Sequence, residues 1–312
     1  TGATGKLGAK VASRLEKHGA KQRLIVRDVG RAPHLKNAEI AQVAAYGDAP
    51  SMNKALSGVK TLFLVSAHDR MGVAQQAAQK GLAAPPYDRL QEQITAIDAA
   101  VAAGVSRIVY LSFLHAAEDA VFVLSREHYR TEEYIKSAGI AYTFLRPCLY
   151  LENAPLRVSS DGIIRAPAGN GRVAWVTRDD IADVAAAVLT GTGHEGHTYD
   201  VTGPEALTMA ETAARIAAAA GKKVKYIAQT AEETRALHDA SGMDKFAAER
   251  RALTGHGLDD NEVEIWVTHY LQIAAGALDV VSDTVPKLTG HPAQSLAEYL
   301  HLHPESYRHI GR

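Results

Sequence analysis

The chain has 312 residues, of which 46% are hydrophobic, and its formal net charge at pH 7 is −1. This near-zero charge provides no field that would attract nucleic acid or an anionic membrane, and no apolar run approaches the roughly 20 residues of a membrane span. A single cysteine, Cys148, excludes an internal disulfide and is typical of a protein of the reducing cytoplasm.

The sequence begins Thr-Gly-Ala-Thr-Gly-Lys-Leu-Gly, with glycines at positions 2, 5 and 8, and an amphipathic helix is expected at 7–18. Glycine permits a tight turn and close backbone approach, and a helix N-terminus attracts phosphates, so this arrangement suits a dinucleotide pyrophosphate. The alternative is a glycine-rich turn without a ligand. An apolar stretch at 23–27 ends 19 residues after Gly8, near the usual spacing of the group that binds the ribose, which favours the dinucleotide.

Such a turn normally follows a buried strand, and no residue precedes Thr1, so we expect the first strand to be missing from the sequence. Strands and helices then alternate, which predicts an α/β protein with a parallel sheet. Its ligands should bind at the carboxyl ends of the strands. The expected strands are 23–27, 40–43, 61–65, 107–111 and 141–145, and the expected helices are 7–18, 51–56, 88–103 and 126–137.

The second half is less regular and mainly helical. We expect one segment, 198–201, to rejoin the main sheet. The other expected elements are short strands at 173–176 and 223–227 and helices at 179–189, 209–220, 231–240 and 262–275.

The fourteen histidines do not predict a metal site. His194 and His197 lie in a glycine-rich loop and His301 and His303 near the C-terminus, without cysteine or acidic partners at ligand spacing. Cys148 lies in an apolar run, which favours a buried thiol over a nucleophile.

Several motifs together resemble the NmrA-like group of atypical short-chain dehydrogenase/reductases, in particular its quinone-reductase and triphenylmethane-reductase-like members. They are the N-terminal Gly-Ala-Thr-Gly-Lys-Leu-Gly, His128-Tyr-Arg-Thr-Glu, Tyr142-Thr-Phe-Leu-Arg-Pro, Glu152-Asn, Thr202-Gly-Pro-Glu-Ala-Leu-Thr and Leu288-Thr-Gly-His-Pro. The resemblance implies a Rossmann-like, doubly wound parallel sheet over residues 1–155 that binds NADP(H). Residues 156–312 would form a smaller, mainly helical part that holds a small-molecule substrate. We expect a cytoplasmic monomer or homodimer without nucleic-acid or membrane partners.

The resemblance also implies a set of cofactor-binding residues. Arg27 stands where NAD enzymes carry a carboxylate for the ribose hydroxyls, and a guanidinium there suits the 2′-phosphate of NADPH. Asp28 beside it complicates this interpretation, and the alternative for Arg27 is a solvated charge at a strand end. The implied set is Gly2, Thr4, Gly5, Lys6, Leu7 and Gly8 in the turn, followed by Arg27, Asp48, Val65, Ser66 and Pro147.

Asp48 resembles the carboxylate that accepts a hydrogen bond from the adenine amino group, and its alternative role is to cap the helix at 51–56. Val65 and Ser66 end a strand where the backbone of the family approaches the cofactor riboses. Ser66 is alternatively a plain turn residue.

The Tyr-x-x-x-Lys pair of most short-chain dehydrogenases is missing, because Glu133 and Ala138 stand four residues after the two candidate tyrosines. His128 occupies the place where isoflavone-reductase-like relatives carry a lysine, so its imidazole is a candidate proton donor. The alternative is a histidine that packs beside the cofactor. Ser112 and Tyr150 are expected to complete the lining of the nicotinamide pocket.

An electron-poor conjugated acceptor needs less acid catalysis than a ketone, because hydride addition leaves a stabilised anion or neutralises a cation. We therefore expect an NADPH-dependent oxidoreductase acting on a quinone, an enone or a dye-like cation. One alternative is a non-catalytic, redox-sensing regulator that binds NADP. The other, a nucleotide-sugar epimerase or dehydratase, is disfavoured by the missing tyrosine–lysine pair.

Overall fold

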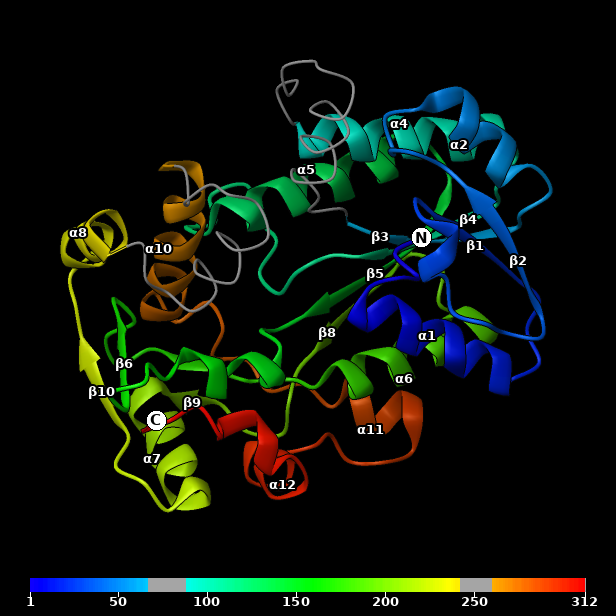
Figure 1. Ribbon diagram of the computed structural model, residues 1–312. Helices are drawn as coiled ribbons and strands as arrows, with labels where there is room; N and C mark the ends of the chain where they lie inside the picture. Colours follow the sequence, from blue (N-terminus) through cyan, green and yellow to red (C-terminus); the bar gives the residue numbers. More distant parts are fainter. Residues whose placement is uncertain (67–87, 242–259, 312) are drawn as a thin grey trace. The chain divides into compact units, whose positions relative to one another are not determined.

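The structure is a computed structural model that describes residues 1–66, 88–241 and 260–311 (Figure 1). It divides into two compact units whose segments alternate along the chain, whereas the sequence analysis expected one boundary after residue 155. The first unit contains Thr1–Ser112, Glu127–Arg146 and Ile181–Tyr199. The second contains Phe113–Arg126, Pro147–Asp180 and Asp200–Arg312.

The main sheet has the strand order β3-β4-β5-β8, with β3 at Thr61–Val65, β4 at Arg107–Leu111, β5 at Ala141–Pro147 and β8 at His197–Val201. β4 pairs in parallel with both β3 and β5. The predicted parallel sheet is confirmed, and so is the prediction that the 198–201 segment rejoins it. β1 (Gln22–Val26) and β2 (Ala38–Gln42) form a separate parallel pair.

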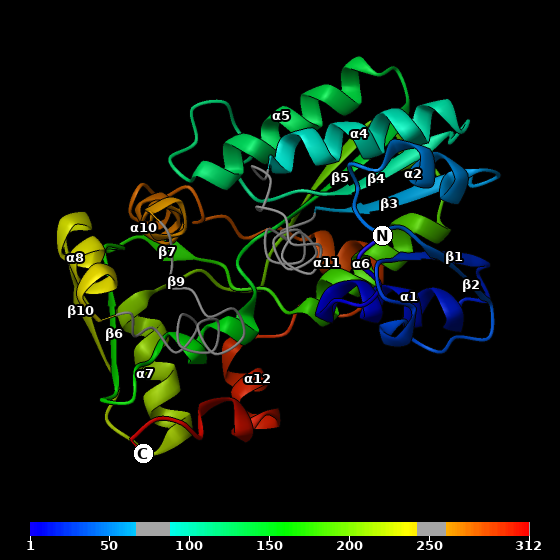
Figure 2. The same cartoon turned by 45° about the horizontal axis from the view of Figure 1, so that its top comes forward.

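Helices cover both faces of the main sheet. Figures 1 and 2 show α4 (Arg89–Ala102) and α5 (Val123–Ser137) on one face, with α1 (Lys6–Lys17) and α6 (Arg178–Thr190) on the other. Every residue of β4 is therefore buried, as expected for a central strand of a parallel sheet. α2 (Ala49–Leu56) packs against α4, and a short 3-10 helix, η1 (Val29–Arg31), follows β1.

The second unit is built from short strands and helices. β6 (Ile163–Ala166) pairs in parallel with β10 (Lys225–Ala228), and β7 (Arg172–Val173) pairs antiparallel with β9 (Leu207–Thr208). The predicted strand at 173–176 is thus shorter, and Val176 makes only an isolated bridge to Tyr150. The remaining elements are η2 (Leu151–Asn153), η3 (Pro155–Arg157), α7 (Met209–Ala220), α8 (Ala231–Ser241), α10 (Asp260–Ala274), α11 (Thr284–Thr289), α12 (Leu296–Leu302) and η4 (Pro304–Tyr307).

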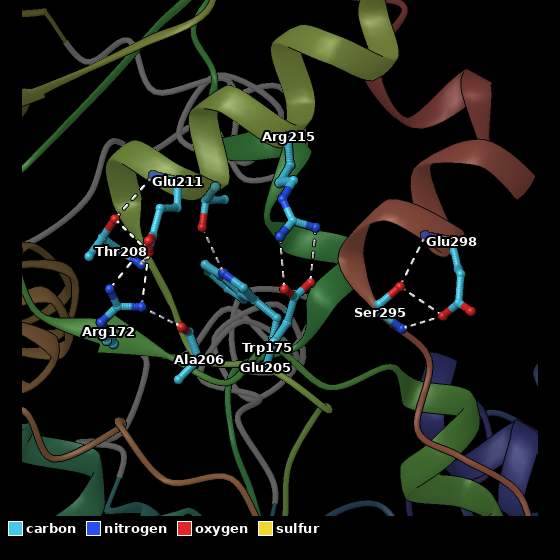
Figure 3. Close-up of polar contacts among 10 residues, drawn as sticks. Arg172, Trp175, Glu205, Ala206, Thr208, Glu211, Arg215, Ser295 and Glu298 are labelled. Atoms are coloured by element: carbon cyan, nitrogen blue, oxygen red, sulfur yellow. Dashed lines mark hydrogen bonds and ion pairs between the residues drawn. The ribbon is translucent and has the colours of Figure 1, made fainter.

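The Thr202-Gly-Pro-Glu-Ala-Leu-Thr motif anchors α7 within the second unit (Figure 3). Thr208 caps α7 in a reciprocal pair with Glu211, and Arg172 joins Glu211 to the carbonyl oxygen of Ala206. A second capping pair, Ser295 with Glu298, starts α12. The contacts of this motif are structural.

Candidate active site

The glycine-rich turn packs tightly against the end of β3. Gly2 has a positive φ of 68°, and a Cβ there would lie 2.9 Å from the Val65 Cβ. A Cβ on Gly8 would lie 2.1 Å from the Gly2 carbonyl oxygen, which also accepts a hydrogen bond from the Gly5 N–H at 2.9 Å. Gly2 and Gly8 are therefore required by the turn itself, before any ligand is considered.

The exposed end of α1 has the features of an anion site. Gly5 is its exposed N-cap residue and has no side chain to occupy the N–H groups of the first turn, where no acidic residue stands. Lys6 is exposed beside it, Thr4 is half-buried, and Leu7 is buried and anchors the helix. These residues fit a dinucleotide pyrophosphate, because N–H groups and the positive end of the helix dipole meet phosphate charge.

At the tip of β1, the structure separates the roles of Arg27 and Asp28. The Asp28 carboxylate caps η1 by accepting a hydrogen bond from the Gly30 N–H at 2.9 Å. Asp28 is thus used by the turn, while Arg27 is exposed at the strand end. Asp28 therefore has a structural role in the turn, and the recognition of a 2′-phosphate by Arg27 stays a prediction.

The other implied cofactor residues of the first unit have defined local contacts. Asp48 is the N-cap of α2 and accepts a hydrogen bond from the Ser51 N–H at 3.1 Å. Hydrogen bonding from the Ser51 side chain, and secondarily from its N–H, lowers the pKa of the Asp48 carboxyl. Both backbone groups of Val65 are bonded: its N–H donates to the Thr1 hydroxyl and its carbonyl accepts from the Tyr46 hydroxyl. Ser66 follows β3. The adenine and ribose roles of these residues remain predictions.

A buried chain of hydrogen bonds connects α4, β4 and α5 around His128. Its Nε2 lies 3.0 Å from the Arg89 guanidinium and its Nδ1 lies 2.8 Å from the Tyr110 hydroxyl. The Tyr110 hydroxyl donates onward to Gln93 at 2.9 Å, and Gln93 donates to Thr131 at 3.2 Å. His128 is only 6% exposed.

These contacts determine the state of the imidazole. Because a guanidinium has no acceptor, Nε2 of His128 must accept from Arg89, so the ring proton sits on Nδ1 and is donated to Tyr110. Burial, and secondarily the charge of Arg89, holds the pKa of His128 well below its ordinary value. His128 is therefore neutral, and these contacts favour the packing alternative, although its catalytic role remains untested.

Ser112 belongs to a second buried cluster, at the carboxyl ends of β4 and β5. Its hydroxyl donates to Glu132, which is fully buried on α5 and forms a two-pronged ion pair with Arg146. This cluster explains why the Thr-Glu and Leu-Arg-Pro motifs occur together: they join α5 to β5.

The remaining predicted residues belong to the second unit. The carbonyl of Pro147 accepts from the Leu114 N–H at 2.9 Å. Tyr150 is half-buried and stacks under the Arg178 guanidinium, 4.2 Å from its ring centroid, and Arg178 also pairs with Glu152. The Glu-Asn motif thus fixes the start of α6.

Cys148 is 1% exposed, and burial raises the pKa of its thiol to about 12, which confirms a buried thiol. Within residues 1–66, 88–241 and 260–311, no three histidine, cysteine or acidic side chains are grouped to hold a metal.

Sequence reasoning missed Arg89, Gln93 and Tyr110. Arg89 and Gln93 lie 39 and 35 residues before His128, at polar positions of a helix. Tyr110 lies 18 residues before His128, inside an apolar strand. No local pattern identifies them as partners of His128.

The parallel sheet and the glycine-rich turn at the start of α1 define a Rossmann-like α/β protein with a dinucleotide-type binding turn. Residues 1–260 match the NmrA-like family. The chain therefore belongs to the NmrA-like family, which confirms the predicted resemblance.

Its relatives match almost end to end. The chain is 32% identical over 314 residues to the NAD(P)H azoreductase of Xenophilus azovorans, covering 98% of this chain and 97% of that one. Among solved structures, the NADPH-dependent quinone oxidoreductase of Escherichia coli complexed with NADPH superposes with a TM-score of 0.79, 32% identity, and coverage of 97% and 98%. The triphenylmethane reductase of Citrobacter sp. superposes with a TM-score of 0.77 and 30% identity, covering 99% of this chain and 98% of that one. A negative transcriptional regulator, NmrA, is similar at 17% identity with a TM-score of 0.69, which shows the fold alone.

Proposed function

We propose that the chain is an NADPH-dependent oxidoreductase that transfers hydride to an electron-poor conjugated acceptor such as a quinone, an enone or a dye-like cation. The predicted class, an oxidoreductase that uses NADP(H), is confirmed by relatives with these activities at 30% identity or more over nearly their whole length. The observation that carries the proposal is the turn at the start of α1, which Gly2 and Gly8 shape and Gly5 leaves open.

In this proposal, the first unit holds the cofactor. The N-terminal N–H groups of α1 bind the pyrophosphate, and the exposed guanidinium of Arg27 pairs with the 2′-phosphate. NADPH supplies a hydride when bound. Positioning by these contacts contributes much of the rate, because the acceptor needs little further activation.

The buried network supports an acceptor of this kind. His128 is neutral, its Nε2 accepts from Arg89 and its proton points to Tyr110, so donating a proton to an acceptor would require breaking this chain. We propose that His128 positions α5 against β4, and that the reduced acceptor takes its proton from water. Quinones, enones and cationic dyes tolerate this arrangement because their reduced forms are stabilised or neutral.

The test measures NADPH oxidation by the parent chain and by His128→Gln with a quinone, an enone and a triphenylmethane dye. Glutamine can still accept from Arg89, so we expect kcat to remain within about threefold for all three acceptors, far less than the 10²- to 10⁴-fold loss of a general acid. A loss of that larger size confined to the quinone and the enone would restore His128 as the proton donor.

The same NADPH-oxidation assay, together with a measurement of NADPH binding, distinguishes the enzyme from the competing function, a non-catalytic NADP-binding regulator. Tight NADPH binding without turnover of any acceptor would reject the enzyme proposal in favour of the regulator.

We further propose that the protein works in the cytoplasm on a small molecule, as a monomer or homodimer. In the part of the chain that the structure describes, no helix has the length and apolar character needed to cross a membrane.

A further inference from the structure

β10 is an edge strand of the second unit, where it forms a two-stranded parallel sheet with β6 (Figures 1 and 2). At the start of this pairing, the Lys225 N–H donates to the carbonyl oxygen of Gly162 at 3.0 Å. Along a strand, successive residues direct their N–H and C=O groups to opposite sides. The backbone groups of Tyr226 and Ala228 therefore face the edge of β10 that is remote from β6.

The edge formed by Tyr226 and Ala228 is open. In the part of the chain that the structure describes, no hydrogen bond occupies the backbone N–H or C=O of either residue. The Tyr226 hydroxyl donates to the carbonyl oxygen of Ala166 in β6 at 2.9 Å, so its side chain is directed toward β6 and not across the edge. Ala228 is exposed and carries only a methyl group. Open backbone groups of this kind are a template for another strand.

The exposed face of residues 223–227 is basic and partly apolar. Lys223, Lys225 and Ile227 are exposed and alternate with residues that are buried or half-buried, so their side chains share one face. Ile227 is 45% exposed. Among the residues that the structure describes, no carboxylate pairs with Lys223 or Lys225. On the neighbouring strand, by contrast, Arg165 pairs with Asp161 at 2.7 Å. The face therefore presents uncompensated positive charge beside an apolar side chain.

An extended acidic segment of a partner protein complements this edge, whereas a second copy of the chain does not. Self-pairing of two β10 edges would bring the lysines of both copies close together, and lysines on edge strands are a common device against such pairing. Acidic side chains on an added strand would instead lie opposite Lys223 and Lys225, which stabilises neighbouring strands. Binding of this kind gains affinity from main-chain hydrogen bonds and specificity from alternate side chains.

We propose that β10 is a docking strand for an extended acidic segment of a partner protein. The segment adds to the open edge through hydrogen bonds with the backbone groups of Tyr226 and Ala228. Its acidic side chains pair with Lys223 and Lys225, and an apolar side chain contacts Ile227. These residues all belong to the second unit, and the proposal does not depend on the reductase activity proposed above.

The test measures the fluorescence anisotropy of a labelled peptide, Glu-Thr-Glu-Thr-Val-Thr-Glu-Thr-Glu, titrated with the full chain. Its acidic residues and its valine share one face of a strand, and its sequence is the same in both directions, so it suits parallel or antiparallel docking. Two further peptides carry N-methyl groups either on the threonines or on the other residues. Because these two sets of N–H groups point to opposite edges of the peptide, only one set can bond to β10.

We expect the parent to bind the unmodified peptide, and N-methylation of one set to abolish binding while N-methylation of the other set leaves the affinity within about threefold. Ala228→Pro removes one open N–H and leaves the pairing with β6 intact, so it should weaken binding about 2- to 10-fold. Ala228→Val, which retains the N–H, is the matched control. Lys225→Gln should weaken binding about two- to fivefold at low salt and have no effect at high salt.

Failure of the parent to bind the unmodified peptide would overturn the proposal. So would equal effects of the two N-methylated sets, which would indicate attraction by charge without strand addition. If sedimentation finds that the parent is a dimer and that Ala228→Pro is a monomer, the edge belongs to a second copy and the proposal is wrong. If Ala228→Pro does not fold, as judged by circular dichroism, the comparison of the two N-methylated peptides still decides the question.

Discussion

Gly8 and Gly5 provide a test of the turn, because at Gly8 local helix propensity and tertiary packing predict changes in stability of opposite sign. Gly8 lies in the first turn of α1, where replacing glycine by alanine normally stabilises a helix by up to about 1 kcal/mol. An alanine Cβ at this position would, however, lie 2.1 Å from the Gly2 carbonyl oxygen and 2.6 Å from the Gly2 carbonyl carbon. Both are backbone atoms, so a side-chain rotation cannot relieve the contact.

We therefore expect Gly8→Ala to lower the free energy of unfolding by about 1–3 kcal/mol, the usual cost of overpacking, and to weaken NADPH binding because the turn must shift. Gly5→Ala is the matched variant: its Cβ would lie 3.3 Å from the same oxygen, and its φ of −87° suits any residue. We expect it to change stability by less than about 1 kcal/mol while weakening NADPH binding, because the proposed pyrophosphate approaches the backbone next to Gly5 and a Cβ there would crowd it.

Urea denaturation and NADPH titration of both variants separate the two effects. A Gly8→Ala protein as stable as the parent would refute the packing argument. A Gly5→Ala protein that binds NADPH normally would show that the pyrophosphate does not approach this part of the turn.

Three further variants follow from the contacts of the first unit. Arg27→Ala should weaken NADPH binding about 10- to 100-fold and leave NADH binding unchanged in fluorescence titrations, because only NADPH has the 2′-phosphate. The pKa values of His128 and His269 are depressed in the folded state, so unfolding takes up protons below about pH 6.5 and stability falls as the pH is lowered through that range, by up to about 1.4 kcal/mol per pH unit for each histidine. His128→Gln should remove one histidine's share of that slope in denaturation curves measured between about pH 5.5 and 7.5, about one unit either side of the free histidine value. Glu132→Gln should cost about 3–5 kcal/mol of unfolding free energy, because it leaves the Arg146 charge without its buried partner.

For each of these variants, one outcome would contradict the reasoning behind the prediction. Equal losses of NADPH and NADH affinity would make Arg27 a structural residue. An unchanged pH slope in His128→Gln would mean that the pKa of His128 is the same in the folded and the unfolded protein. If adding Arg146→Met to Glu132→Gln fails to recover stability, the cost does not arise from the unpaired guanidinium.

The two buried polar networks give structural partners to several of the motif residues of this chain. Arg89, His128 and Tyr110 connect two helices to the central strand, and Glu132 with Arg146 connects α5 to β5. Removing one partner leaves a buried polar group unpaired, so the members of each network depend on one another for stability. This packing role accounts for much of the motif without assigning it chemistry.

The sequence alone determined the features that depend on local chemistry. Strands of continuous apolar residues, amphipathic helices ended by glycine and the glycine-rich start predicted the parallel sheet, and most helix and strand bounds lie within a few residues of the observed ones. The motif order predicted the family. These signals are readable because backbone conformation and hydrophobic periodicity are encoded by residues close in the chain. Shorter elements such as β6, α11 and α12 escaped prediction, since their local patterns are weak and tertiary packing maintains them.

Only the tertiary structure decided which polar side chains meet. It placed Arg89 on Nε2 of His128 and so made a candidate acid into a neutral acceptor. It also showed that the Asp28 carboxylate accepts a hydrogen bond within a turn, and it placed Arg157 beside the aromatic rings of α10. The protonation state of a side chain and its hydrogen-bond partners depend on burial and on residues far away in the sequence. The residue type alone shows neither of these.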